Sequence, residues 1–336
     1  MIRVGLVKGK DSYRAVRRAL ELVRSDVQVP RDRPVLIKPN MVSPVEPSAA
    51  TPVEAVRATM DFLRSFGVER FIVAEGTAAP EGDTMGAFER FGYFALKEHH
   101  NVEFRNLHED DHVSFETLDQ DLKPVNIRLA KSLFNCYLVS VAPMKTHLQV
   151  IVTLTIKNIA MGAIYNPDRH SLAWQQRQPG VFSHDPQPLN LHIARLAQAL
   201  TPALAVIDGV VGMEGEGPVK GTPIASEVAL AGTNALAVDI VGSEVMGFDY
   251  RTIGYLWYLS QFRGLSREDI QVEGEEPARC VTRFKPYEKL PELLSWWREN
   301  WRDYLSGSYI KLRETSRKGS ARTAGPCKGD TPELLK

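Results

Sequence analysis

Short apolar runs alternate with amphipathic stretches along most of the chain. The runs are nearly continuous in apolar residues, as in strands covered on both faces, and they occupy residues 2–7, 35–38, 71–74, 137–141, 203–207 and 227–231. In the stretches between them apolar residues recur at helical spacing, most regularly in residues 12–24, 51–66 and 189–200. Because strands that alternate with helices build parallel sheets, we predict an α/β protein with a mainly parallel sheet, helices on both faces and one or two α/β lobes.

The stretch Pro143–Gly162 has the sequence PMKTHLQVIVTLTIKNIAMG and contains two lysines and a histidine in an apolar setting. Its first polar residues follow the predicted strand at 137–141, and we expect a helix over residues 150–161 after them. Thr153 and Lys157 are four residues apart, so they would share one face of that helix.

The two lysines of this stretch, Lys145 and Lys157, each need a partner. A lysine among apolar residues must pair, reach solvent along its own aliphatic chain, or lose its proton. We expect Lys157 to be the more buried, because Ile156 and Ile159 flank it. The alternative to a ligand-facing role is that both amines reach water at the surface. We assign catalytic roles to Lys145, His147 and Lys157, with His147 or a lysine of depressed pKa as general acid or base.

Four predicted strands end in a charged side chain, namely Lys38, Glu75, Lys145 and Asp208. Parallel strands point the same way, so their carboxyl ends meet at one edge of the sheet, where ligands bind in open α/β folds. We therefore expect Lys38, Lys145 and Asp208 to line one cavity. The predicted substrate-binding residues are Lys38, Asn40, Glu75, Thr153, Asn158, Arg169 and His170.

A long irregular segment, residues 163–188, follows the central stretch. It has few apolar residues for its length, which is typical of a lid or binding loop. Within it, Arg169 and His170 are available to close on an anion.

The glycine-rich segment 209–221 matches neither a dinucleotide fingerprint nor a phosphate-binding loop. Its Glu214 and Glu216, together with Asp208, form a candidate divalent-metal site. The alternatives are a substrate amine or a lysine as their partner, or a tight turn with solvated carboxylates. Asp239 lies in a predicted helix of small apolar residues, where a buried carboxylate must pair, so we expect a structural role for it.

Composition limits the classes of function. The chain has 336 residues, 43% of them hydrophobic and 24% charged, with a formal net charge of zero. It therefore has no overall basic field for nucleic acid or anionic lipid, and no apolar run of the ~20 residues that span a bilayer. The three cysteines, Cys136, Cys280 and Cys327, have neither zinc nor iron–sulfur spacing. With no signal peptide, a cytoplasmic location is expected.

Two further segments carry predictions. The acidic segment 103–126 contains His108 and His112, which we interpret as part of a solvated loop in preference to a metal site. Tryptophans 296, 297 and 301 lie at near-helical spacing and predict a C-terminal helix that packs on the body or forms a homodimer contact. We divide the chain into an α/β domain at 1–285, this helix at 286–306 and a disordered tail at 307–336.

A series of short motifs runs in order through residues 1–254. They are KPN at Lys38–Asn40, MKTH at Met144–His147, TIKN at Thr155–Asn158, IDG at Ile207–Gly209, MEGEGPVKG at Met213–Gly221 and AVD at Ala237–Asp239. Together they resemble the domain of unknown function 362 family. The resemblance implies the α/β fold. Many family members are described as iron–sulfur proteins because they carry a ferredoxin-like cysteine-rich module, which this sequence lacks, so no cluster is expected here.

These observations favour a cytosolic enzyme that binds a small anionic metabolite, a carboxylate or phosphate, at the carboxyl edge of the sheet. Lys/His acid–base chemistry would then serve proton or group transfer on a carboxylate substrate, with a divalent cation as the one candidate cofactor. The alternatives are a non-catalytic ligand sensor using the same site and an electron-transfer or iron–sulfur-associated protein. Catalysis should depend on His147 far more than binding does, which separates enzyme from sensor.

Overall fold

A computed structural model describes residues 1–78, 83–165, 185–306 and 313–314 of the chain. Its main feature is a nine-stranded sheet in the order β11-β1-β10-β9-β7-β2-β3-β4, with β8 paired to β7. The strands are β1 (Ile2–Lys8), β2 (Val35–Lys38), β3 (Arg70–Glu75), β4 (Asn101–Asn106), β7 (Tyr137–His147), β8 (Ile151–Thr153), β9 (Leu204–Glu214), β10 (Thr222–Gly232) and β11 (Ile270–Gly274). Only β8 and β10 run against the others, so the predicted mainly parallel α/β fold is confirmed.

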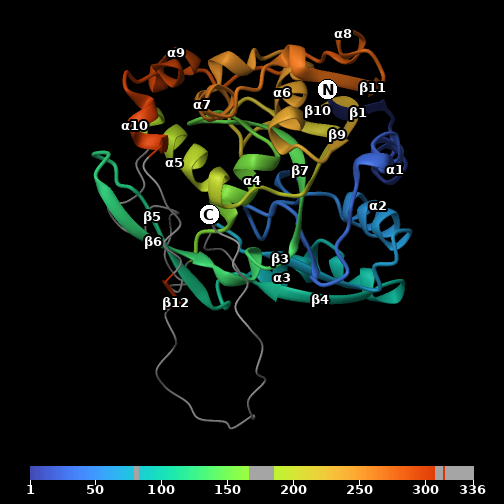
Figure 1. Ribbon diagram of the computed structural model, residues 1–336. Helices are drawn as coiled ribbons and strands as arrows, with labels where there is room; N and C mark the ends of the chain where they lie inside the picture. The colour runs from blue at the N-terminus through green and yellow to red at the C-terminus, as the bar shows by residue number, and fades with distance from the viewer. Residues whose placement is uncertain (79–82, 166–184, 307–312, 315–336) are drawn as a thin grey trace.

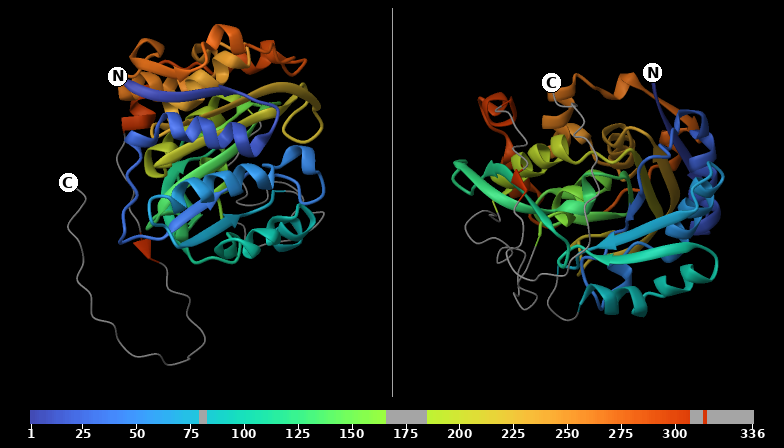
Figure 2. Two further views of the ribbon diagram at one scale, coloured as in Figure 1. Left: turned by 90° about the vertical axis from the view of Figure 1, so that its right-hand side faces the viewer. Right: turned by 60° about the horizontal axis from the view of Figure 1, so that its bottom comes forward.

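Helices cover both faces of this sheet (Figures 1 and 2). Successive strand residues alternate between the two cores: Leu36 packs with one and Ile37 with the other. One core contains helices α1 (Ser12–Leu22), α2 (Val53–Arg64) and α3 (Thr84–Arg90). The other contains α4 (Thr155–Gly162), α5 (Pro186–Ala199), α6 (Ala235–Val245) and α7 (Gly254–Arg263).

The central stretch differs from its prediction. Residues 151–153 form β8, which pairs with the end of β7, and the helix begins only at Thr155. Asp239 on α6 accepts hydrogen bonds from the Thr155 amide (3.0 Å), its hydroxyl (2.6 Å) and the Ile156 amide (2.9 Å). These bonds satisfy free amides at the start of α4, so the predicted structural role of Asp239 is confirmed. Burial raises the pKa of Asp239 to about 7, against these hydrogen bonds.

A second, three-stranded sheet has the order β12-β5-β6 and contains β5 (His112–Leu118), β6 (Pro124–Ala130) and β12 (Arg313–Glu314). It corrects the prediction of a solvated loop over residues 103–126. Val113, Phe115 and Thr117 of β5 are buried while the polar residues between them are half-buried, which is the alternation of a strand with one face on the core. His108 is also buried, with Nε2 2.9 Å from the Thr77 carbonyl oxygen.

The C-terminal part is helical, as predicted, but the helix is interrupted. It consists of α9 (Leu290–Leu293), a 3₁₀ turn (Leu294–Trp296) and α10 (Trp301–Ser306). Trp296 and Trp301 are buried with their ring centroids 5.5 and 5.6 Å from that of Trp257, whereas Trp297 is 51% exposed. Two of the three tryptophans therefore pack on the body, and the homodimer contact remains a prediction. No helix among the described residues is long and apolar enough to cross a membrane.

Candidate functional site

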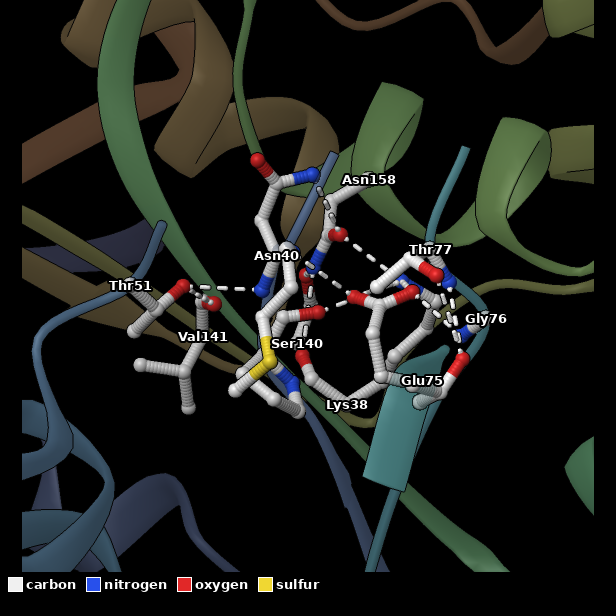
Figure 3. A network of polar contacts seen from close by, with 12 residues as sticks. Lys38, Asn40, Thr51, Glu75, Gly76, Thr77, Ser140, Val141 and Asn158 are labelled. Atoms are coloured by element: carbon white, nitrogen blue, oxygen red, sulfur yellow. Dashed lines mark hydrogen bonds and ion pairs between the residues drawn. The ribbon is translucent and has the colours of Figure 1, made fainter. Parts of the chain in front are cut away.

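A buried ion pair joins the ends of β2 and β3 (Figure 3). The Lys38 amine lies 2.9 Å from both carboxylate oxygens of Glu75. Glu75 also accepts hydrogen bonds from the amides of Met41 (3.1 Å) and Gly76 (2.7 Å). The two strands are parallel neighbours, so their final side chains meet, as predicted from the strand ends. Glu75 is thus fully occupied by Lys38 and by backbone donors.

Asn158 ties this ion pair to helix α4. Its Oδ1 accepts from Lys38 Nζ (2.9 Å) and Asn40 Nδ2 (3.2 Å), while its Nδ2 donates to the Lys38 carbonyl and to Ser140 Oγ (3.1 Å each). The Lys38 side chain runs so close to α4 that a Cβ at Gly162 would lie 2.2 Å from Lys38 Cε. Glycine at the end of this helix therefore makes room for the lysine.

Lys145 is completely buried on β7 and has only neutral partners among the described residues. Its Nζ donates to Asn40 Oδ1 (2.7 Å) and to the carbonyl oxygen of Ala49 (2.6 Å). Burial, together with the charges of Lys157 and Lys38 and against the opposing charge of Glu75, lowers the pKa of Lys145 to about 7. Glu75 acts on Lys145 through its electrostatic field, while its hydrogen bonds go to Lys38 and the backbone.

His147 and Thr153 lie on the same face of the β7–β8 hairpin as Lys145. In this register Lys145 is opposite Thr153 and His147 is opposite Ile151. The Gln149 amide donates to His147 Nδ1 (3.1 Å), so the neutral ring carries its proton on Nε2. Burial, followed by the charges of the two nearby lysines, holds the pKa of His147 well below its usual range. The Thr153 hydroxyl is buried without a hydrogen-bond partner in the described part of the chain.

Lys157 completes a group that we call the lysine–histidine cluster: Lys145, His147, Thr153 and Lys157. Lys157 on α4 is 9% exposed and Lys145 0% exposed, so the prediction that Lys157 is the more buried was wrong. The first turn of α4 leaves its side chain nearer the surface, and Thr153 lies on β8, so the two do not share a helix face. The charge of Lys157 still reaches Lys145 and His147, since it lowers the pKa of both.

The third predicted member of the cavity, Asp208, lies elsewhere. Its Oδ1 accepts from the Val210 amide (3.0 Å), and its Oδ2 has no hydrogen-bond partner within the described part of the chain. Burial raises the pKa of Asp208, and the other groups that act on it include Ser12 and Asp11 at the start of α1. The register pairs Asp208 with Pro143, two residues before Lys145, while Lys145 itself pairs with Met213.

The remaining candidates do not join the cluster. Glu214 accepts from the Lys285 amide (2.7 Å), and Glu216 is exposed. Within the described ranges no group of three or more His, Cys, Asp or Glu side chains is placed to hold a metal ion. Arg169, His170 and most of the predicted lid lie outside the described residues. The metal, substrate and lid assignments therefore stay predictions.

Two contacts of the site are not among those predicted from the sequence. The Ala49 carbonyl, which accepts from Lys145, belongs to the loop after β2. Because every residue has a backbone carbonyl, the sequence does not indicate which one will bind a side chain. Ser140 of β7 links Asn158 to the Thr155 carbonyl (3.0 Å), and only its polarity within an apolar strand pointed to it. A separate cavity of about 390 Å³, lined in part by Arg33 and Phe66, lies at the amino ends of β2 and β3 and contains none of these residues.

Comparison with known proteins finds similar chains among curated proteins and among solved structures. The chain is 28% identical over 231 residues to the thylakoid-associated protein sll1697 of Synechocystis sp., a match that covers 67% of this chain and 66% of that protein. Lactate racemase apoprotein from Thermoanaerobacterium thermosaccharolyticum superposes with a TM-score of 0.44 and 12% identity, covering 73% of this chain and 56% of that one. A Thermotoga maritima protein gives 0.40 and 14%, covering 62% and 53%. At these TM-scores the similarity says nothing about a reaction.

The sequence profile of a single family matches residues 35–244, from β2 to the last turn of α6. This range contains the ion pair, Asn158 and the whole lysine–histidine cluster. The chain belongs to the family described as domain of unknown function (DUF362).

Proposed function

We propose that this protein binds a small anionic metabolite, a carboxylate or a phosphate, at the lysine–histidine cluster and acts on it by acid–base chemistry. The observation that carries the proposal is the arrangement around Lys145. This amine is completely buried and has two neutral acceptors, while the nearby carboxylate of Glu75 is bonded to Lys38. A buried amine without a carboxylate partner must lose its proton or receive an anion.

The local charge balance supports an anionic ligand. The charges of Lys38 and Lys157 both act on Lys145, and Glu75 is the carboxylate among the groups that set the pKa of Lys145. An anion beside Lys145 would supply a negative charge next to its amine and raise the pKa of that amine. Binding at pH 8 is therefore coupled to the uptake of close to one proton, roughly the change from a neutral to a charged lysine.

The same groups supply acid–base chemistry. In the neutral form Lys145 is a general base with a pKa near 7, the range in which such bases work best. His147 presents a neutral N–H donor at Nε2, suited to a hydrogen bond with a substrate oxygen. The Lys38–Glu75 ion pair holds Asn158, and Asn158 accepts a hydrogen bond from Asn40. Asn40 in turn accepts a hydrogen bond from Lys145 and orients its amine.

Isothermal titration calorimetry tests the proposal directly. Pyruvate, succinate and inorganic phosphate serve as probes, each in two buffers of different ionisation enthalpy, so that proton uptake is measured with affinity. We expect at least one probe to bind with proton uptake and Lys145→Met to weaken it by roughly tenfold or more. The control Lys10→Met, at a lysine whose side chain is 82% exposed, should bind as wild type. Equal affinity in wild type and Lys145→Met would refute the site.

A second variant separates an enzyme from a binding protein. His147→Gln keeps a side-chain amide donor but removes the imidazole. With pyruvate or succinate as the probe, exchange of its C–H protons with deuterium is followed by NMR. Unchanged affinity together with loss of this exchange indicates acid–base catalysis. Exchange at the wild-type rate in His147→Gln would contradict the role of His147, and no exchange in wild type would favour the sensor.

A further inference from the structure

The hydrogen bonds of Lys145 fit one protonation state of its amine better than the other. A neutral amine has two N–H bonds and one lone pair, whereas an ammonium has three N–H bonds and none. Lys145 has two acceptors, Asn40 Oδ1 and the Ala49 carbonyl, at 2.7 and 2.6 Å. Both N–H bonds of the neutral form are therefore satisfied, and the lone pair meets no hydrogen-bond donor among the described residues. The geometry presents a nucleophilic nitrogen.

Opposite Lys145 on the neighbouring strand β8 lies a second polar group without a hydrogen-bond partner among the described residues. Thr153 is directly opposite Lys145 in the antiparallel register of β7 and β8, and such pairs place their side chains on one face, with Cβ atoms about 4.5–5.5 Å apart. The hydroxyl of Thr153 is buried and makes no hydrogen bond in the described structure. Native proteins seldom leave a buried hydroxyl unbonded, so a ligand oxygen next to Lys145 is the natural partner.

We propose that Lys145 forms an imine with a 2-oxo acid, a substrate that carries a carbonyl group next to its carboxylate. This inference rests on the proposed function, because the carboxylate would occupy the anion position of the lysine–histidine cluster. The carbonyl carbon would meet the Lys145 nitrogen and its oxygen would meet the Thr153 hydroxyl. The two features of the substrate thus match the missing negative charge and the unbonded hydroxyl.

The chemical step balances without a further reagent. The nitrogen lone pair attacks the carbonyl carbon, a C–N bond forms, and a proton moves from nitrogen to oxygen to give the carbinolamine. The C–O bond then breaks, and the hydroxyl leaves as water with one more proton, which comes from solvent and passes through the Thr153 hydroxyl. The protonated imine retains one N–H, and Asn40 or Ala49 accepts its hydrogen bond.

The surroundings favour this nucleophile over the other lysines. Burial and the neighbouring charge of Lys157 keep about half of the Lys145 amine neutral at pH 7, the same combination that activates lysines for imine formation. At pH 7 a lysine with a pKa of about 7 is neutral about a thousand times more often than one with an ordinary pKa. Lys38 has no such freedom, because its amine is held by both oxygens of Glu75.

Reductive trapping tests the inference on the full-length wild-type chain. The protein is incubated at pH 7 with pyruvate, 2-oxoglutarate or phenylpyruvate and sodium cyanoborohydride, and the modified residue is located by peptide mass mapping. We expect one stable adduct, at Lys145, with at least one of the three acids. Acetone, which lacks the carboxylate, and acetate, which lacks the carbonyl, should leave Lys145 unmodified under the same conditions.

The variants separate a specific adduct from surface chemistry. Lys145→Met should abolish the adduct, Thr153→Val should slow its formation about tenfold, and Lys10→Met should change nothing. Because the wild-type map identifies the residue by itself, the test stands even if Lys145→Met fails to fold. Adducts spread over exposed lysines, or none at Lys145 with any of the three acids, would overturn the imine. If an anion still binds calorimetrically in that case, the proposed function survives; if none binds, both fall.

Discussion

Replacing Lys38 by methionine leaves the charge of Glu75 buried without its cation. The Lys38 and Glu75 side chains are 1% and 3% exposed and 2.9 Å apart. Breaking one side of such a pair typically costs about 3–5 kcal/mol, since the remaining charge stays out of water. Glu75 keeps its hydrogen bonds from the amides of Met41 and Gly76, so we expect a loss near the lower end, about 3 kcal/mol.

Urea unfolding followed by circular dichroism measures this loss. With a slope of about 3 kcal/mol per molar urea, a loss of about 3 kcal/mol moves the midpoint down by about 1 M. The double variant Lys38→Met/Glu75→Gln removes both charges and should recover part of the loss. Together with the single variant Glu75→Gln, it completes a double-mutant cycle. Lys10→Met at the exposed Lys10–Glu227 pair is the matched control and should not move the midpoint measurably. If the urea midpoint of Lys38→Met shifts no more than that of the control, Lys38→Met does not leave a buried, uncompensated charge on Glu75, and this prediction is refuted.

Three further variants probe the neighbouring groups. Asp239→Ala leaves the Thr155 and Ile156 amides at the start of α4 unpaired, so it should lower the free energy of unfolding by about 2–4 kcal/mol in the same urea assay. A loss below about 1 kcal/mol would contradict the capping role. Lys157→Met removes a like charge and should raise the pKa of Lys145, read from the pH dependence of its reductive trapping; an unchanged profile would show that Lys157 lies out of range. Between about pH 7 and 10.5, Lys145 is deprotonated in the folded state but protonated in the unfolded state. The free energy of unfolding of wild type should therefore rise with pH in this range relative to that of Lys145→Met, by up to about 1.4 kcal/mol per pH unit. Parallel pH profiles of the two proteins would refute this.

The parts of the site that the sequence predicts correctly follow from strand direction. Lys38 and Glu75 each end a short apolar run, and parallel neighbours must bring such ends together. Asp208 also ends an apolar run, but its position depends on the register of β9 against β7. Register is set by packing between strands far apart in the chain, so strand ends alone do not show which side chains meet.

The hairpin at the centre of the site could not be read from local pattern. Residues 150–153 are apolar apart from Thr153 and lie next to a helical stretch, and short apolar runs fit a strand or a buried helix equally well. These residues form a strand because they pair with the end of β7, where Thr153 lies opposite Lys145. The same pairing places a hydroxyl opposite the lysine, which helical spacing would have assigned to Lys157.

The charge state of the Lys145 amine is the central claim, and a titration measures it most directly. Lysine side chains labelled with ¹³C at Cε are followed by NMR from pH 5 to 11, and the resonance missing from Lys145→Met identifies Lys145. We predict a transition near pH 7 for this resonance. A transition of the Lys145 resonance near pH 10.5 would mean that the amine is charged at neutral pH, and it would contradict both the acid–base role and the imine.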